Sequence, residues 1–282
     1  MQIKFLGLIA AAFMASAVSA VAASPAGDVI HFYSLDPKHH YEVSGTLYTP
    51  TGATAPSPAV VMVHGTMGID SRGAFYRGPI LNAGIAVLEV DFKTGIYHSP
   101  LDRPSPETFL GMGFAALKEL RKNTAIDPDR IGIMGFSLGG HLTVDTAFDA
   151  NRAAWMGRDK GFSTHLAFYP VCKRFLSRDD LKMTGAPMLI LYGTEDSYGD
   201  GTNVPALKNL LLQKEHYEIA TIEYPGASHG FNMNEPPKHY WDPAAIGHRG
   251  HTEFDPAATN DSLPHVVDFL RTTLHVAGPD AH

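Results

Sequence analysis

The sequence predicts an α/β protein with a mostly parallel central sheet that is covered by helices on both faces. Short apolar runs, such as residues 59–63 and 86–90, contain almost no polar residue, which is typical of strands buried on both faces. Segments with helical periodicity separate these runs, as expected for parallel strands joined by crossover helices. A third run, residues 131–134, leads directly into a glycine-rich turn followed by a helical segment.

The elements follow one another in a regular order. Two strands come first, at residues 29–34 and Glu42–Tyr48, and the second alternates apolar and small or polar residues. The remaining strands are expected at residues 59–63, 86–90, 131–134, 164–169, 187–192 and 217–224. Helices are expected at residues 76–83, 107–122, 141–150, 204–215 and 261–274, of which 107–122 is strongly amphipathic. We see no linker, so residues 24–282 are expected to form a single domain.

The first 23 residues have the pattern of a secretory signal peptide. A positive start that includes Lys4 precedes the apolar run 5–18, and small residues follow up to a cleavage site expected after Ala20 or Ala23. The apolar run is short for a membrane span. We therefore expect an exported protein, periplasmic or secreted, with no membrane association after signal cleavage.

Composition excludes some function classes. The formal net charge is −7, and the 22 Lys and Arg residues are scattered, so there is no electrostatic footprint for nucleic acid. Cys172 is the single cysteine, which rules out an intramolecular disulfide and favours a buried small apolar side chain. The sequence does not indicate an oligomeric state.

Residues 135–139 read Gly-Phe-Ser-Leu-Gly, directly after a predicted strand and before a predicted helix. A serine in this strand–turn–helix setting is raised above the sheet edge on a strained turn, with the first N–H groups of the helix nearby. Glycines at 135 and 139 let the turn approach its neighbours closely. This pattern predicts that Ser137 is a nucleophile.

A nucleophilic serine needs a base, and the base needs a carboxylate that orients it. Asp196 follows the strand 187–192 in the segment Gly-Thr-Glu-Asp, and His229 follows the strand 217–224 in a glycine-flanked loop. The chain order serine, acid, base matches a known hydrolase pattern. The alternatives are Glu195 or Asp200 as the acid, and His64 as the base, although its place just before a glycine favours a role in shaping the loop.

Two backbone N–H groups should stabilise an oxyanion, each lowering the barrier by about 3 kcal/mol. One belongs to Leu138, and the other to Thr66, with Met67 as the alternative, in the loop after strand 59–63. Substrate contacts are expected from Met67, Phe136, Tyr198, Phe231 and Trp241.

An unusual insert, residues 232–254, follows His229 and is rich in histidine and aromatic residues. It could form a flap over the site and suit an apolar or aromatic acyl group. His239, His248 and His251 also allow a metal site, but no acidic or cysteine ligand stands at a diagnostic spacing. We therefore predict neither a metal nor a cofactor.

These motifs together resemble the dienelactone hydrolase family of α/β-hydrolases, over most of the chain after the signal peptide. The matching segments are His64-Gly65, residues 135–140, Tyr192 to Asp196, His229 to Phe231 and Asp255 to Ala258. Dienelactone hydrolases proper have a cysteine nucleophile where this chain has Ser137, and a glutamate where it has Gly65. Their arginine after the catalytic histidine has no match in residues 230–234.

The resemblance implies a general serine esterase that cleaves small-molecule carboxylic esters or lactones through an acyl-enzyme. A peptidase or acyltransferase on the same fold is an alternative, although the chain has no room for the large cap that peptidases usually add. A non-catalytic binding protein is the other alternative, and the intact set of Ser137, Asp196 and His229 argues against it.

Overall fold

The computed structural model describes residues 27–53, 56–92 and 105–276. Eight strands form one sheet in the order β1-β2-β4-β3-β5-β6-β7-β8. The strands are β1 (Asp28–Tyr33), β2 (Glu42–Tyr48), β3 (Ser57–Val63), β4 (Ala86–Asp91), β5 (Ile126–Phe136), β6 (His165–Phe168), β7 (Met188–Gly193) and β8 (Ala220–Tyr224). β1 and β2 pair antiparallel, β2 joins β4 antiparallel, and every pairing from β4 to β8 is parallel.

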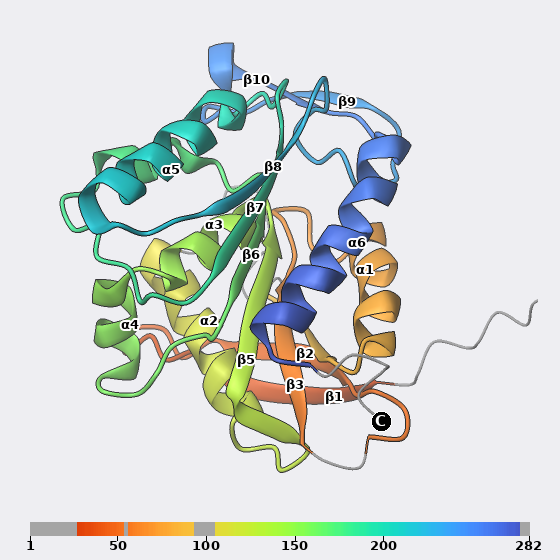
Figure 1. Ribbon diagram of the computed structural model, residues 1–282, viewed down its shortest axis with the longest axis vertical. Helices are drawn as coiled ribbons and strands as arrows, with labels where there is room; N and C mark the ends of the chain where they lie inside the picture. Colours follow the sequence, from red (N-terminus) through yellow and green to blue (C-terminus); the bar gives the residue numbers. More distant parts are fainter. Residues whose placement is uncertain (1–26, 54–55, 93–104, 277–282) are drawn as a thin grey trace, which may run out of the picture.

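Helices cover both faces of the sheet, so the predicted fold class is confirmed. They are α1 (Ser71–Asn82), α2 (Pro106–Leu120), α3 (Leu138–Thr146), α4 (Asp149–Met156), α5 (Asp200–Glu215) and α6 (Pro256–Thr273), with 3₁₀ turns η1 (Cys172–Ser177) and η2 (Ile246–His248). In Figure 1, α1 and α6 lie on one side of the sheet, and α2, α3, α4 and α5 lie on the other. Within the described ranges, none of the helices is long and apolar enough to cross a bilayer.

The apolar runs are buried on both faces because alternate side chains enter different cores. In β3, Val61 and Val63 pack in the cluster that includes the apolar face of α2, whereas Val60 and Met62 pack with residues of α1 and α6. All seven residues of β3 are buried. A continuous apolar run is what a strand needs when it has a helix layer on each side.

Two predicted boundaries were wrong around the serine turn. The helix expected at residues 141–150 begins at Leu138, and a second helix, α4, starts at Asp149. The early start follows from the single-residue turn, because Ser137 alone reverses the chain between β5 and α3. Phe148 adopts an extended conformation and is fully buried, which separates α3 from α4.

The insert at residues 232–254 contains a small second sheet. Its strands β9 (Lys238–Trp241) and β10 (Arg249–Thr252) pair antiparallel, with His239 opposite His251 and Tyr240 opposite Gly250. We call residues 238–252 the hairpin. In Figure 1 it lies at the end of the molecule where β7 and β8 terminate, above α5 and α6.

Candidate active site

The turn at Ser137 explains the glycines around it. Ser137 has φ 53° and ψ −111°, a strained conformation that lifts its hydroxyl above the carboxyl end of β5. A Cβ at Gly135 would lie 2.1 Å from the carbonyl oxygen of Gly139, and one at Gly139 would lie 2.4 Å from that of Val63. A side chain at either position would collide with backbone. Both positions therefore require glycine, because helix α3 lies close to strands β3 and β5 at this turn.

The three residues expected at strand ends converge. Nε2 of His229 lies 2.8 Å from Oγ of Ser137, and its Nδ1 lies 2.8 Å from Oδ2 of Asp196. Asp196 and His229 are each 4% exposed. This arrangement can take a proton from the serine hydroxyl at one ring nitrogen while the carboxylate holds the other.

The alternative acids lie elsewhere. Glu195 is exposed, and Asp200 is fully buried with its carboxylate accepting hydrogen bonds from the backbone N–H groups of Val171 and Cys172 at 2.7 and 2.6 Å. Burial and the charge of Asp196 raise the pKa of Asp200 to about 7, although the two N–H groups lower it. Asp200 therefore holds the chain after β6, and Asp196 is the carboxylate that reaches His229.

Both ring nitrogens of His64, the alternative base, form hydrogen bonds with backbone atoms. Its Nε2 accepts a hydrogen bond from Phe92 N–H at 3.0 Å, so Nδ1 carries the proton and donates to the carbonyl of Gly65 at 2.6 Å. His64 thus fixes the start of the loop after β3, the role that the sequence favours for it.

That loop turns back beside the serine. Gly68 N–H donates to the Gly65 carbonyl at 3.1 Å, which leaves Thr66 and Met67 at the tip of the turn. Thr66, Met67 and Ser137 line the same pocket. Leu138 is the first residue of α3, where N–H groups have no partner within the helix. Of the two expected oxyanion donors, Leu138 therefore follows Ser137 directly and Thr66 lines the same pocket as Ser137.

Two tyrosine rings contact the imidazole of His229. The ring centroid of Tyr198 is 4.4 Å from that of His229, and the centroid of Tyr169 is 4.8 Å away. Tyr198 N–H also donates to Oδ1 of Asp196 at 2.7 Å. These contacts restrict the movement of the imidazole ring.

A pocket of about 460 Å³ opens above Ser137, a volume suited to a small molecule. Of the predicted substrate contacts, Met67, Tyr198 and Trp241 line it. Phe136 and Phe231 do not: Phe136 stacks on Phe168 with centroids 5.0 Å apart, and Phe231 is fully buried against Tyr224. Both follow or precede a site residue in sequence, but their side chains turn into the core shared with α1 and α6.

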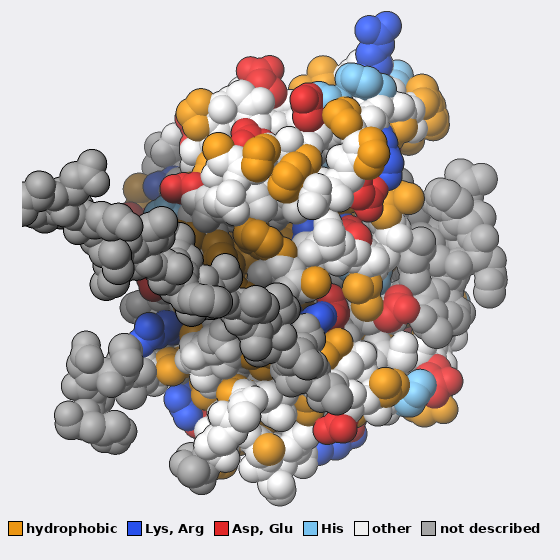
Figure 2. Space-filling model, turned by 90° about the vertical axis from the view of Figure 1, so that its right-hand side faces the viewer, with side chains coloured by type: hydrophobic (Ala, Val, Ile, Leu, Met, Phe, Trp, Pro, Cys, Tyr) orange, Lys and Arg blue, Asp and Glu red, His pale blue; other side chains and the backbone are white. Residues whose placement is uncertain are grey.

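Sequence reasoning missed several pocket residues. The hairpin supplies Lys238, His239, Tyr240, Asp242 and Thr252 in addition to Trp241, and the loop before it supplies Met233. Trp241 is 74% exposed and Met67 is 67% exposed, so apolar side chains stand at the mouth of the pocket. The aromatic composition of the insert was the only available signal for this wall. Figure 2 shows histidine and hydrophobic side chains gathered at the upper end of the molecule, where Figure 1 places β9 and β10.

Arg72 is a buried cation behind the loop, and it was also missed. Its guanidinium forms an ion pair with Asp70, donates to the hydroxyl of Tyr169 at 3.0 Å and lies 5.0 Å from the ring centroid of Phe136. Tyr169 in turn donates to Oδ1 of Asn232. The network joins the loop after β3, the end of β6 and the segment after His229, which fixes their spacing around Ser137.

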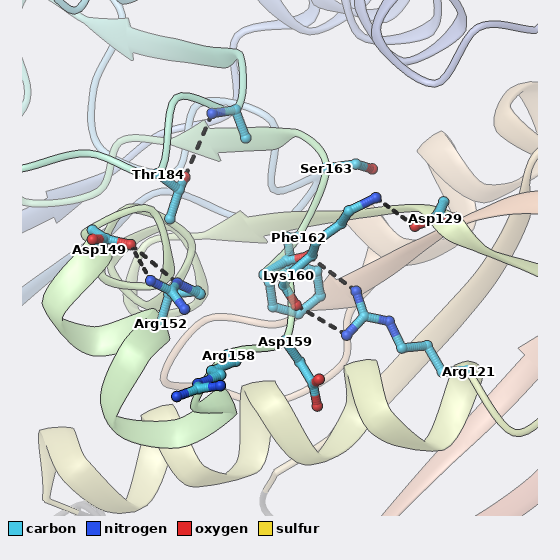
Figure 3. Close-up of a pocket in the computed structure, with 12 residues that line it drawn as sticks. Arg121, Asp129, Asp149, Arg152, Arg158, Asp159, Lys160, Phe162, Ser163 and Thr184 are labelled. Atoms are coloured by element: carbon cyan, nitrogen blue, oxygen red, sulfur yellow. Dashed lines mark hydrogen bonds and ion pairs between the residues drawn. The ribbon is translucent and has the colours of Figure 1, made fainter.

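A second pocket, of about 400 Å³, lies at the other end of the strands, near the amino-terminal ends of β5, β6 and β7 (Figure 3). Its charged side chains largely pair with one another or with backbone: Arg152 with Asp149, Lys160 with Asp129, and Arg121 with the carbonyls of Lys160 and Gly161. Ligands of open parallel sheets bind at the carboxyl ends of the strands. The pocket above Ser137 is therefore the candidate active site.

The histidines of the insert stack rather than converge on a metal position. The rings of His239 and His251 are parallel with centroids 4.4 Å apart, whereas His248 lies against Trp241 with centroids 6.0 Å apart. Among residues 27–53, 56–92 and 105–276, no group of three or more His, Cys, Asp or Glu side chains could hold a metal ion. Cys172 is fully buried, and burial raises the pKa of its thiol.

The sheet order, the serine turn and the strand-end placement of acid and base define a protein of the α/β-hydrolase type. Residues 43–274 match the sequence profile of the dienelactone hydrolase family, and the chain belongs to that family. An uncharacterized protein of Mycobacterium tuberculosis (strain ATCC 25618 / H37Rv) is 26% identical over 195 residues, which are 66% of this chain and 67% of that protein.

Solved structures share the fold at low identity. Thermogutta terrifontis esterase 2, phosphorylated by paraoxon, has a TM-score of 0.63 and 17% identity, and the match covers 90% of this chain and 97% of that one. A dienelactone hydrolase-like promiscuous phosphotriesterase from metagenomic libraries has a TM-score of 0.61 and 16% identity, with 88% and 99% coverage. Family membership supports hydrolase activity.

Proposed function

We propose that the protein is a serine hydrolase that cleaves carboxylic esters or lactones of small molecules. The observation that carries this proposal is the hydrogen-bonded series from Ser137 through His229 to Asp196, with 2.8 Å at each step, on the floor of a pocket. The apolar mouth around Met67 and Trp241 favours an ester with an apolar group next to the reacting carbonyl.

The reaction proceeds in two acyl transfers. Oγ of Ser137 attacks the ester carbonyl carbon while His229 takes the hydroxyl proton, and the carbonyl oxygen becomes an oxyanion facing Leu138 and Thr66 N–H. The carbon–oxygen bond to the leaving alcohol breaks, and His229 returns the proton to that oxygen. Water then attacks the acyl-enzyme, with His229 as base again, to release the acid and regenerate Ser137.

The first test is labelling of the purified protein with a fluorophosphonate, beside turnover of p-nitrophenyl esters from acetate to octanoate. We expect labelling and turnover in the natural protein and loss of both in Ser137→Ala. Circular dichroism and thermal unfolding would show that the variant is folded. Equal turnover in Ser137→Ala, or no labelling of the natural protein, would overturn the proposal and favour a binding protein.

A mass measurement extends the test. Because Thermogutta terrifontis esterase 2 is phosphorylated by paraoxon, we propose that Ser137 accepts the same group. Oγ would displace p-nitrophenolate from phosphorus, and the protein would gain one diethylphosphoryl group. The added mass should map to the peptide that contains Ser137; modification elsewhere would contradict the assigned nucleophile.

We further propose that residues 1–23, which lie outside the described residues, direct export and are then removed. Expression of the full sequence in a bacterial host with a secretory pathway should place the mature protein in the periplasm or medium. Amino-terminal sequencing should begin after Ala20 or Ala23. Retention of Met1 on cytoplasmic protein would contradict export.

A further inference from the structure

The hairpin is attached to the loop that carries the triad acid. Backbone N–H of Ile246 donates to the Ser197 carbonyl at 2.8 Å, and backbone N–H of His251 donates to Ser197 Oγ at 3.1 Å. Thr252 also forms a β-bridge with His229. The insert therefore contacts the backbone next to Asp196 and the catalytic histidine itself.

Tyr198 adds a side-chain connection to the same hairpin. Its hydroxyl donates to Oδ2 of Asp242 at 2.9 Å and lies 3.2 Å from the hydroxyl oxygen of Tyr240. Tyr198 is 8% exposed and Asp242 is 7% exposed. Burial, together with Tyr240 and Asp242, raises the pKa of Tyr198, so the hydroxyl keeps the proton that it donates.

The other parts of Tyr198 contact the triad. Its backbone N–H donates to Asp196, and its ring lies against the imidazole of His229 at a centroid distance of 4.4 Å. One residue thus contacts the acid with its backbone, the base with its ring and the hairpin with its hydroxyl. A displacement of the hairpin would be transmitted through Tyr198 to two members of the triad, Asp196 and His229.

We infer that Tyr198 is a positioning residue that couples the hairpin to the triad and makes the hairpin a fixed wall that selects substrates by size. This inference rests on the proposed ester hydrolysis and adds to it the residue that controls its selectivity. Tyr240 and Trp241 of the wall line the pocket together with Met67 of the loop after β3. Esters whose apolar group fits between these side chains are accepted, and larger groups are excluded as long as Tyr198 holds the wall in place.

The variant Tyr198→Phe tests the contact between the Tyr198 hydroxyl and the hairpin apart from the other contacts of this residue. Phenylalanine keeps the ring against His229 and the backbone N–H to Asp196, and it removes only the hydroxyl. A hydrogen bond to a charged group contributes about 1.5–3 kcal/mol, so amide exchange in residues 238–241 and 249–252 should accelerate by about tenfold or more. The ratio of kcat/KM for p-nitrophenyl acetate to that for the octanoate should fall several-fold, because the released wall admits the longer chain.

Tyr217→Phe is the matched control. Tyr217 is a partly buried tyrosine whose hydroxyl donates to the Ala186 carbonyl at 2.5 Å, just before β7 and at the opposite end of that strand from Asp196. This variant should leave both hairpin exchange and the substrate ratio at the values of the natural protein. Trp241→Ala, which shortens the wall but keeps Tyr198, should change the substrate ratio without accelerating exchange in residues 249–252.

The two proposals can fail separately. If Tyr198→Phe is labelled by fluorophosphonate but matches Tyr217→Phe in exchange and in substrate ratio, the coupling is overturned and the esterase assignment stands. If the natural protein is neither labelled nor active, the esterase assignment fails, and faster exchange in Tyr198→Phe would still support the attachment of the hairpin.

Discussion

His229 Nδ1 lies 2.8 Å from Oδ2 of Asp196, and the other carboxylate oxygen accepts the backbone N–H of Tyr198 at 2.7 Å. The carboxylate is fixed from both sides, so it holds one orientation of the imidazole. Because the carboxylate accepts from Nδ1, the neutral histidine carries its proton there and presents a bare Nε2 to Ser137.

Asp196→Asn should abolish most turnover while leaving the fold intact. An amide NH₂ toward Nδ1 favours the tautomer with its proton on Nε2, which cannot accept the serine proton, and the comparable change in a serine protease lowers kcat about 10⁴-fold. We expect kcat for p-nitrophenyl acetate to fall by about three to four orders of magnitude with little change in KM. Glu195→Gln, at the exposed neighbouring carboxylate, should retain activity. If instead Glu195→Gln were the inactive variant, the acid would be misassigned.

The close approach of backbone segments at the serine turn predicts that a side chain at Gly139 destabilises the protein. Gly139→Ala would place a methyl group 2.4 Å from the Val63 carbonyl oxygen and 2.7 Å from that of His64. Overpacking of this kind costs about 1–3 kcal/mol, and the clash here is with backbone that cannot rotate away. We expect a lower midpoint in urea unfolding and a distorted Leu138 N–H, hence lower kcat.

Gly78→Ala is the control for that variant. Gly78 lies within α1, and apart from its chain neighbours and its own helix nothing lies within 4 Å of its would-be Cβ. Alanine there should change the free energy of unfolding by no more than about 1 kcal/mol, because the helix preference for alanine is opposed by the restriction that Pro79 places on the residue before it. A Gly139→Ala protein as stable and as active as Gly78→Ala would contradict the close packing of β3 against the turn.

The buried ion pair of Asp70 and Arg72 predicts a characteristic double-mutant result. Their side chains are 11% and 5% exposed. Arg72→Met leaves a buried carboxylate without its cation, and loss of one partner typically costs about 3–5 kcal/mol. Asp70→Asn alone still caps α1, because asparagine accepts the Arg72 N–H that Asp70 now accepts.

The double variant Asp70→Asn, Arg72→Met should be more stable than Arg72→Met alone, because the uncompensated charge is gone. Urea unfolding of the four proteins measures the coupling. Additive losses would mean that Arg72 stabilises the loop through Tyr169 and Phe136, and that the ion pair itself contributes little.

The sequence predicts the convergence of Ser137, Asp196 and His229 because each is tied to a local signal. In each case an apolar strand ends, a glycine-containing turn follows, and the candidate catalytic residue lies in that turn. Parallel strands end at the same edge of a sheet, so three local signals locate one place in space. The same reasoning predicts which strand ends carry the site residues, but it does not predict side-chain directions. Phe136 and Phe231 stand next to or near site residues in sequence, and their side chains point into the core.

The contacts of Arg72 and Tyr198 could not be predicted in this way. Arg72 reaches a tyrosine 97 positions away, and Tyr198 reaches an aspartate 44 positions away. Each contact depends on how separate loops pack above the sheet, and no periodicity in the sequence encodes that packing. The hairpin was likewise visible only as an aromatic and histidine-rich composition, because its strands are short, and because Pro236 and Pro237 before it and Pro243 within it are typical of a loop.

The burial of His165 predicts that the free energy of unfolding decreases at acidic pH. His165 is fully buried in β6, and burial lowers its pKa to about 4. In the unfolded chain a histidine binds a proton below pH 6.5 or so, whereas the native His165 does not. Stability is therefore lost as pH falls from about 6.5 toward 4, by an amount on the order of 3 kcal/mol for this residue. His141, whose pKa is lowered to about 3 by burial and by Arg174, adds to the same slope.

His165→Gln removes the titrating group, so its unfolding free energy should fall less steeply between pH 6.5 and 4.5 than that of the natural protein. His265→Gln is the control, since His265 on α6 is about half exposed. Urea unfolding at several pH values measures the slopes. Parallel pH profiles for the natural protein and His165→Gln would show that His165 is protonated in the folded state or that its proton is taken up equally on unfolding.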